Sequence, residues 1–322
     1  MAVFKKLALG AGLAALLSTA AHADLAGKVI GFSQIGSESG WRAAETSVTK
    51  SEAEKRGIDL KFADAQQKQE NQIKAIRGFI AQGVDAILVA PVVSTGWDEV
   101  LGEAKEANIP VVLLDRGVDA SPDLYLTGVA SDQVKEGAVA GKWLIDTLAG
   151  KECNVVELEG TVGSSPAINR KKGFDDAVGA TANIKVIRSQ TGDFTRAKGK
   201  EVMEGFLKAE GGGKGICAVY AHNDDMAVGA IQAIKDAGLK PGSDILVVSI
   251  DGVPDIFSAM VAGEANATVE LTPNMAGPAF DALDAYLNGG TAPEKAIITE
   301  SKLFTQADDP QGEYDRRKGL GY

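Results

Sequence analysis

From residue 28 onward, short apolar runs alternate with longer amphipathic segments, and this alternation constrains the fold more than any other feature of the chain. The first run, VIGFSQI at 29–35, is continuous, as is typical of a strand buried on both faces of its sheet. The segment at 41–57 has a polar face and ends at Gly57, which predicts a helix. Strands linked through helices by short connections form parallel, right-handed sheets. The sequence therefore predicts an α/β fold with doubly wound parallel sheets.

The same pattern occurs in both halves of the chain, so two sheets are expected. In the first half the predicted strands lie at 29–35, 58–65, 84–92, 109–115 and 124–130, with helices at 41–57, 69–83 and 97–107. In the second half the predicted strands lie near 153–158, 185–190, 216–221, 245–250 and 267–270. The helices of that half are expected at 132–149, 166–179, 195–209, 224–237, 254–262 and 274–288. The polar tail at 289–322 is predicted to be a surface segment.

Residues 1–23 have the organisation of a secretory signal peptide. Two lysines precede the apolar segment 7–17, and Ala21 and Ala23 form a small-x-small cleavage pattern before Asp24. The alternative is a membrane anchor, but the apolar segment is shorter than the ~20 residues that a membrane-spanning helix needs. We therefore expect export, cleavage after residue 23 and a periplasmic location.

The two cysteines lie where predicted strands begin, Cys153 before NVVEL and Cys217 before AVYA. Export would place them in an oxidising compartment. If the two strands are neighbours in a parallel sheet, the sulfur atoms can meet across one strand spacing. A disulfide is therefore favoured over the alternative of two free, buried thiols.

Composition and charge argue against several classes of function. The formal net charge is −11, and the chain carries no basic stripe. Such a chain repels phosphate backbones, so no nucleic-acid partner is expected. The motifs of serine hydrolases and of P-loop nucleotide-binding proteins are missing from the sequence. His222 is the only histidine after the signal segment, which favours a structural histidine over a catalytic or metal-binding one.

In the first half, polar and aromatic residues follow the predicted strands at their carboxyl ends, where open α/β sheets bind ligands. Glu38, Trp41 and Arg42 follow the first strand, and Asp115 and Arg116 end the fourth. Trp41 is either a flat apolar face for a ligand ring or a core anchor of its helix. Asp115 and Arg116 are either ligand contacts or a surface ion pair, and their place at a strand end favours ligand contacts.

In the second half, Arg170 lies at the start of a predicted helix and Asp251 ends a predicted strand. Asn223 suits a helix N-cap and can also face a ligand. Asn274 lies where the chain is expected to cross between the halves. These planar groups can bind neighbouring hydroxyls in pairs, and an aromatic face can cover the C–H side of a sugar ring. The set therefore suits an uncharged, polyhydroxylated ligand.

Segments spread over the whole chain resemble a known family, in the family's order. The chain is similar to the periplasmic sugar-binding proteins of the ribose/galactose type (type I), which serve ABC importers. The matching segments are QGVDAILVAPV (82–92), IPVVLLDR (109–116), AHNDDMAVGAIQAIKDAGL (221–239) and SIDGVPD (249–255). Three further segments are most similar to galactofuranose-binding members: GFSQIGSESGWRAAET (31–46), DAQQKQENQIKAIRGF (64–79) and ELTPNMAGPAFDAL (270–283).

The resemblance implies two Rossmann-like lobes that are joined by three crossovers and close over one sugar. The N-terminal lobe would comprise 24–129 and 273–296, and the C-terminal lobe 130–272 and 297–322. The residues implied in sugar binding are Glu38, Trp41, Arg42, Asp115, Arg116, Arg170, Asn223, Asp251 and Asn274.

Two positions depart from the pattern of the ribose binders or leave a choice open. The last polar contact is expected from either Glu270 or Asn274, and Phe194 is a candidate for an opposing aromatic face. The ribose binders carry two adjacent phenylalanines where this chain has Trp41 and Arg42. One stacking face is thus replaced by a cation with hydrogen-bond donors, which argues against ribose as the ligand.

The resemblance implies a monomeric, non-enzymatic receptor that captures a monosaccharide, expected to be galactofuranose, and delivers it to an inner-membrane ABC permease. No cofactor and no metal are implied. The alternatives are a receptor that feeds a sensor kinase or chemoreceptor, a binder of another pentose or hexose, and an exported glycosidase. A LacI-type repressor core shares the implied fold, but it would carry a DNA-binding segment in place of an export signal.

Overall fold

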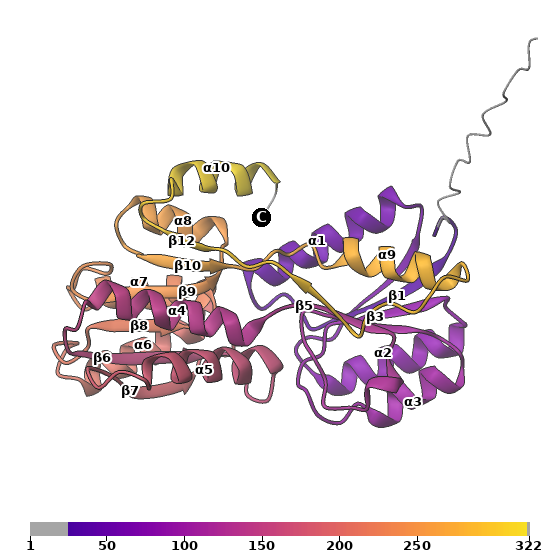
Figure 1. The fold of residues 1–322 in the computed structure, drawn as a ribbon, viewed down its shortest axis with the longest axis horizontal. Helices are drawn as coiled ribbons and strands as arrows, with labels where there is room; N and C mark the ends of the chain where they lie inside the picture. The colour runs from indigo at the N-terminus through magenta and orange to yellow at the C-terminus, as the bar shows by residue number, and fades with distance from the viewer. Residues whose placement is uncertain (1–24, 321–322) are drawn as a thin grey trace, which may run out of the picture.

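Two α/β lobes lie side by side in the computed structural model, which describes residues 25–320 (Figure 1). The predicted signal peptide, 1–23, lies outside the described residues. Each lobe has a six-stranded sheet, with the strand orders β11-β5-β4-β3-β1-β2 and β12-β10-β9-β8-β6-β7. All pairings are parallel except that β12 runs antiparallel to β10. The predicted fold class is therefore confirmed, with one more strand in each sheet than expected.

The elements follow the predicted alternation. The N-terminal lobe contains β1 (Val29–Gln34), α1 (Gly40–Lys55), β2 (Asp59–Asp64), α2 (Gln69–Gln82), β3 (Ala86–Val89), α3 (Asp98–Glu106), β4 (Val111–Leu114), a 3₁₀ turn (Pro122–Leu124), β5 (Thr127–Ser131), α9 (Ala276–Leu287) and β11 (Ala296–Thr299). The C-terminal lobe contains α4 (Gln133–Leu148), β6 (Cys153–Glu159), α5 (Ser165–Val178), β7 (Ile184–Thr191), α6 (Arg196–Ala209), β8 (Ala218–Ala221), α7 (Asp224–Asp236), β9 (Leu246–Asp251), α8 (Pro254–Val261), β10 (Ala267–Glu270), β12 (Leu303–Thr305) and α10 (Pro310–Leu320).

The central strands are apolar along their whole length because helices cover both faces of each sheet (Figure 1). In β3, Leu88 packs into the core on one face, while its neighbours Ile87 and Val89 pack into the core on the other. This is the alternation that a pleated strand imposes on successive side chains. Each lobe thus has two apolar layers, and the carboxyl ends of its strands are left to carry polar groups.

The chain passes between the lobes three times: after β5, after β10 and after β11. β5 ends at Ser131 and β11 ends at Thr299, and both belong to the first sheet. The lobe boundaries that the sequence predicts at residues 129 and 296 therefore fall inside or at the start of these strands. We propose that the lobes divide after Ser131, between Glu270 and Ala276, and after Thr299.

The C-terminal tail differs from the predicted surface segment. It supplies β11, β12 and α10, and α10 packs on α8. Arg317 of α10 is only 1% exposed, lies over the rings of Phe257 and Phe304, and donates to Glu270 Oε1 at 2.6 Å. An arginine stem and its flat guanidinium here fill a core position that sequence patterns assign to an apolar residue.

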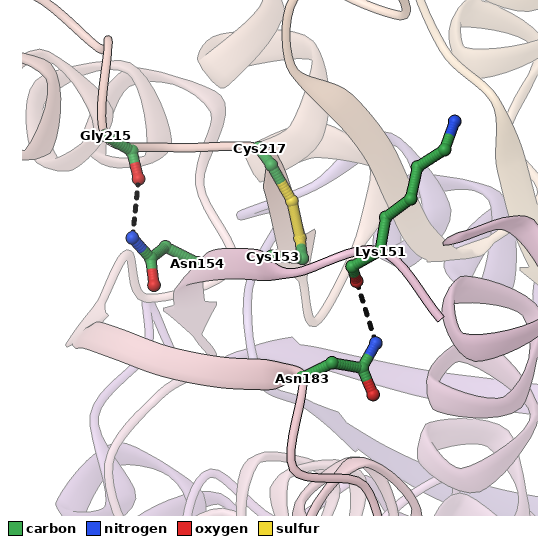
Figure 2. The surroundings of a disulfide bond; sticks show 6 residues. All are labelled: Lys151, Cys153, Asn154, Asn183, Gly215 and Cys217. Carbon is green, nitrogen blue, oxygen red and sulfur yellow. Dashed lines mark hydrogen bonds between the residues drawn. A yellow bond between two sulfur atoms is a disulfide. The ribbon is translucent and has the colours of Figure 1, made fainter. Parts of the chain in front are cut away.

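The predicted disulfide is present, and it joins neighbouring strands of the second sheet (Figure 2). Cys153 begins β6, Cys217 directly precedes β8, and β6 and β8 pair in parallel. The two Cα atoms are 5.4 Å apart, a normal separation for a disulfide. The alternative of two free thiols is therefore excluded.

Candidate functional site

A cavity lies between the two lobes at the carboxyl ends of their strands. About 270 Å³ within it is not filled by atoms, and part of this space is open to solvent. Every predicted sugar-binding residue except Asn274 contributes to its wall. The lining residues are Glu38, Ser39, Trp41, Arg42, Asp115, Arg116, Pro166, Arg170, Phe194, Asn223, Asp251 and Leu271.

The start of α1 brings an aromatic and a cationic side chain to the cavity. Ser39 is the N-cap of α1, and its side chain accepts a hydrogen bond from the Arg42 backbone N–H at 3.1 Å. Trp41 is 4% exposed, and its indole N–H donates to the Leu271 carbonyl at 2.7 Å. The two interpretations of Trp41 do not exclude each other, because the ring belongs to the apolar core and also lines the cavity.

Arg42 is the centre of the N-terminal half of the site. Its Nε donates to Glu38 Oε1 at 3.1 Å, its Nη2 to Asp115 Oδ2 at 2.5 Å, and its Nη1 to Glu45. Burial alone would lower the pKa of Arg42, but the carboxylates of Glu45, Asp115 and Glu38 together raise it. The guanidinium is therefore a permanent cation with a fixed orientation.

Arg116 is the second cation of the N-terminal half. Its Nη1 donates to the Val92 carbonyl at 2.9 Å, and its guanidinium lies 5.2 Å from the ring centre of Phe194, which belongs to the other lobe. Burial and the nearby charge of Arg42 lower the pKa of Arg116 to about 10. The group still carries its proton at neutral pH, and it links the two lobes across the cavity.

Arg170 is the centre of the C-terminal half. Its Nε donates to Glu136 Oε2 at 2.9 Å, and its Nη1 donates to the His222 carbonyl at 2.7 Å. Its Nη2 lies 3.6 Å from Asp251 Oδ1, too far for a hydrogen bond. Burial raises the pKa of Asp251 well above its usual value, and the charge of Arg170 offsets only part of that shift.

Asn223 and Phe194 complete the C-terminal wall. Asn223 caps α7, because its Oδ1 accepts from the Met226 N–H at 3.0 Å, and its Nδ2 donates to the Phe194 carbonyl at 3.1 Å. A Cβ atom on Gly160 would lie only 1.9 Å from Phe194 Cζ. Glycine at position 160 is therefore what lets the Phe194 ring take its place in the wall.

Four polar atoms of the lining are buried without a hydrogen-bond partner among residues 25–320. Two are carboxylate oxygens, which accept, and two are guanidinium nitrogens, which donate. Because an unpaired buried polar atom costs about 1–3 kcal/mol, these atoms favour a ligand with both donors and acceptors. Hydroxyl groups supply both. The four atoms are Glu38 Oε2, Asp115 Oδ1, Arg116 Nε and Arg170 Nη2.

The structure does not bring Asn274 or Glu270 to the cavity. Asn274 is exposed, and its Oδ1 accepts from the Gly277 N–H at 3.0 Å, so its side chain serves the start of α9. Glu270 is paired with Arg317. The chain crossing that the sequence suggested at this point lines the cavity through Leu271 instead.

Sequence reasoning also missed two buried carboxylates behind the arginines, Glu45 and Glu136, both fully buried inside helices. Charged residues in a helix usually mark its solvent face, so no sequence signal separated these two from their exposed neighbours. His222 is fully buried, bonds to Glu157 at 3.0 Å and accepts from the Gly160 N–H at 3.3 Å. It stays behind the cavity wall, as a structural histidine would.

The two lobes touch at the rim of the cavity. The Gly40 N–H donates to Asp225 Oδ2 at 2.7 Å, and the Ser94 N–H donates to the Gly163 carbonyl at 2.9 Å. The Gly117 N–H donates to Ser165 Oγ at 2.9 Å. Each of these bonds joins one lobe to the other, so the structure shows a closed arrangement of the lobes.

Residues 25–320 contain neither a membrane-spanning helix nor a cluster of metal-ligating side chains. No helix in this range is both long and apolar enough to cross a membrane. Over the same range, no three His, Cys, Asp or Glu side chains are grouped so that they could hold a metal ion.

Known proteins of similar sequence and structure have the same architecture. The galactofuranose-binding protein YtfQ of Escherichia coli (strain K12) is 63% identical over 321 residues, or 99% of this chain and 100% of the relative. A solved structure of a galactofuranose binding protein is 66% identical, with a TM-score of 0.90 over 92% of this chain and 100% of that one. The binding component of the arabinose ABC transporter from Shewanella sp. ANA-3, bound to arabinofuranose, is 59% identical, with a TM-score of 0.89 over 91% and 97%.

A family model described as a periplasmic binding protein domain matches residues 30–291, which is most of the chain. The fold agrees with that match, because both lobes have the predicted doubly wound sheets and three crossovers join them. The chain therefore belongs to the periplasmic binding protein family.

Proposed function

We propose that this protein is a periplasmic solute-binding receptor that captures a monosaccharide, galactofuranose, and delivers it to an ABC permease of the inner membrane. It acts as a monomer and makes or breaks no bond. The sugar binds between the lobes and favours their closed arrangement by binding it better than the open one.

The four unpartnered polar atoms of the cavity wall carry this proposal. They come from both lobes and include donors and acceptors, as a ligand with hydroxyl groups all round its ring requires. Trp41 and Phe194 add apolar faces for the C–H groups of such a ring. A charged ligand fits less well, because Arg42, Arg116 and Arg170 are already balanced by buried carboxylates.

The relatives support a furanose in particular. The names of two similar proteins include galactofuranose, and a third similar structure holds arabinofuranose. Both are sugars in the five-membered-ring form.

Calorimetry and thermal-shift measurements against galactose, arabinose, ribose and glucose test the proposal, because only a ligand of the native state raises the melting temperature by mass action. Only a small fraction of galactose in solution is in the furanose form. We therefore expect the apparent affinity for galactose to be lower, by that fraction, than the affinity for galactofuranose itself. With protein in excess, binding should then show a slow phase that a catalyst of sugar ring opening accelerates. Galactose binding without such a phase would contradict the furanose assignment, and turnover of a galactofuranoside would contradict the receptor.

A further inference from the structure

The first turn of α4 lies directly behind the sugar cavity and at the hinge. Gln133 begins α4 two residues after β5 ends, so it lies on the first crossover between the lobes. Ser301 lies between β11 and β12, on the third crossover. The two crossovers start side by side, because Thr299 and Ser131 are partners in the β11–β5 pairing.

Gln133 connects one half of the site to the other. Its Nε2 donates to the backbone carbonyl of Asp115 at 2.7 Å, and its Oε1 accepts from Asn169 Nδ2 at 3.1 Å. Asp115 belongs to the N-terminal lobe and Asn169 is the neighbour of Arg170 in the C-terminal lobe. Gln133 is 5% exposed, and its bond to Asp115 is buried, while its bond to Asn169 is partly buried.

Glu136 connects Arg170 to the third crossover. Its Oε2 accepts from Arg170 Nε at 2.9 Å, and its Oε1 accepts from Ser301 Oγ at 3.1 Å. The carboxylate is fully buried, so it depends on these partners for its stability.

The helix that carries Arg170 cannot move independently of α4. A Cβ atom on Gly137 of α4 would lie 2.1 Å from the Arg170 carbonyl oxygen, and one on Gly173 of α5 would lie 1.9 Å from the Val134 carbonyl oxygen. The two helices therefore pack backbone against backbone. A displacement of Arg170 must be passed on to α4 and hence to the crossover at its start.

Resting on the proposed function, we propose that Gln133, Glu136 and Ser301, here called the hinge network, are positioning residues that couple sugar binding to closure of the lobes. None of the three lines the cavity itself. They hold Asp115 and Arg170 in register with two of the three crossovers, and their bonds are made in the closed arrangement. Loss of a bond in the network therefore shifts the population towards open lobes and speeds release of the sugar.

Ser301→Ala is the most selective test, because it removes the crossover's bond and leaves Arg170 and Glu136 paired. Ser131→Ala is its matched control: it makes the same chemical change on the adjacent crossover, at a hydroxyl with no hydrogen-bond partner among the described residues. Gln133→Met tests the link from Gln133 to Asp115 and Asn169. Ser301→Thr should behave like the wild type, because it keeps the hydroxyl.

Two measurements are needed: the kinetics of sugar binding and release, and the distance between the lobes in the sugar-free protein. Stopped-flow tryptophan fluorescence gives the association and dissociation rates, since Trp41 lines the cavity. Spin labels at Glu99 and Lys172, which are 83% and 61% exposed on opposite lobes, give the distance between the lobes in the sugar-free protein. Failure of the wild type to bind any sugar would contradict the proposed function, while the distance measurement would still decide the hinge network.

We expect Ser301→Ala and Gln133→Met to speed dissociation by about five- to tenfold, the effect of one net hydrogen bond, with association little changed. Both should also lengthen the mean distance between the lobes in the sugar-free protein, whereas Ser131→Ala should do neither. If the two variants match Ser131→Ala in release rate and distance, the proposal is overturned. A lower melting temperature with unchanged release and distance would overturn it too, because the residues would then be structural only.

Discussion

The two halves of the cavity follow the same plan but differ in how completely their charges are paired. In each half an arginine from the start of a helix approaches an aspartate at a strand end, and both aspartates have positive φ, 61° at Asp115 and 129° at Asp251. Arg42 bonds Asp115 at 2.5 Å, whereas Arg170 and Asp251 are 3.6 Å apart and not hydrogen-bonded. The arginine–aspartate pair of the N-terminal half is thus preorganised, whereas that of the C-terminal half is not closed by a hydrogen bond.

This difference sets which half should hold the sugar first. A preorganised half loses little side-chain freedom on binding, which favours the first encounter there. Closure of the lobes then brings Arg170 Nη2, which has no hydrogen-bond partner in residues 25–320, to the sugar hydroxyls. We therefore expect the N-terminal half to hold the sugar first.

The largest loss of sugar binding is expected when Asp115, which pairs with Arg42 in the N-terminal half, is removed. Asp115→Ala removes a partner of the buried Arg42 and a predicted partner of the sugar, and it should weaken binding by about 3 kcal/mol, the upper end for a hydrogen bond to a charged group. Calorimetry measures the affinity, and circular dichroism checks that the fold is kept. An unchanged affinity would show that Asp115 does not contact the sugar.

A smaller effect is expected in the looser half. Arg170→Lys keeps the charge but loses the planar fork that bonds Glu136 and the His222 carbonyl while offering Nη2 to a ligand. We expect binding to weaken by about 2 kcal/mol, within the range for hydrogen bonds to charged groups. The same calorimetry with Arg42→Lys provides the comparison, and a smaller loss for Arg42→Lys would reverse the ranking of the two halves.

The smallest effect, but the sharpest contrast, is expected from replacing each strand-end aspartate by asparagine in the sugar-free protein. Asn tolerates positive φ, so neither change strains the backbone. Asp115→Asn weakens the pairing of Arg42 and should destabilise the fold by about 1–2 kcal/mol. Asp251→Asn removes a carboxylate that burial makes costly to ionise, so at pH 7 it should be neutral or stabilising by about 1 kcal/mol.

The pH dependence of folding stability tests whether Asp251→Asn is neutral or stabilising. Because the pKa of Asp251 is raised in the folded chain, the folded state binds its proton more tightly than the unfolded state does. Its contribution to stability is therefore full below the unfolded pKa of about 4 and is lost as the pH rises through the raised value. Urea denaturation from pH 4 to pH 8 should show this loss in the wild type and a flatter profile in Asp251→Asn. Equal slopes would show that Asp251 is ionised in the folded protein.

The strand ends of the site could be predicted from sequence because a parallel sheet places them all at one edge. Asp115, Arg116 and Asp251 each end an apolar run, and that position alone brought them to the cavity. Glu136 could not be predicted, because its partner Arg170 lies in another helix. Glu45 pairs with Arg42 three residues earlier in α1, a spacing that is equally typical of an exposed pair on a helix surface, so its burial could not be predicted either.

The structure of the C-terminal tail could not be predicted from its sequence either. Polar residues at 289–322 resemble a solvated segment, yet Arg317 fills a core position because Phe257, Phe304 and Glu270 provide it with aromatic faces and a counter-charge. Asn274 was placed correctly near a crossing, but local helix capping takes its side chain away from the cavity. Contacts between distant segments decided both cases.

The three crossovers also determine when the protein can finish folding during its synthesis. The first sheet needs β11, which ends at Thr299, and the second sheet needs β12 and the packing of α10. Neither lobe is therefore complete until the last few dozen residues have been made, even though most of the first lobe is encoded early. A nascent chain of this kind exposes two unfinished sheet edges for most of its synthesis, and such edges are prone to pair with other chains. Its two lobes must then mature together, within one late step.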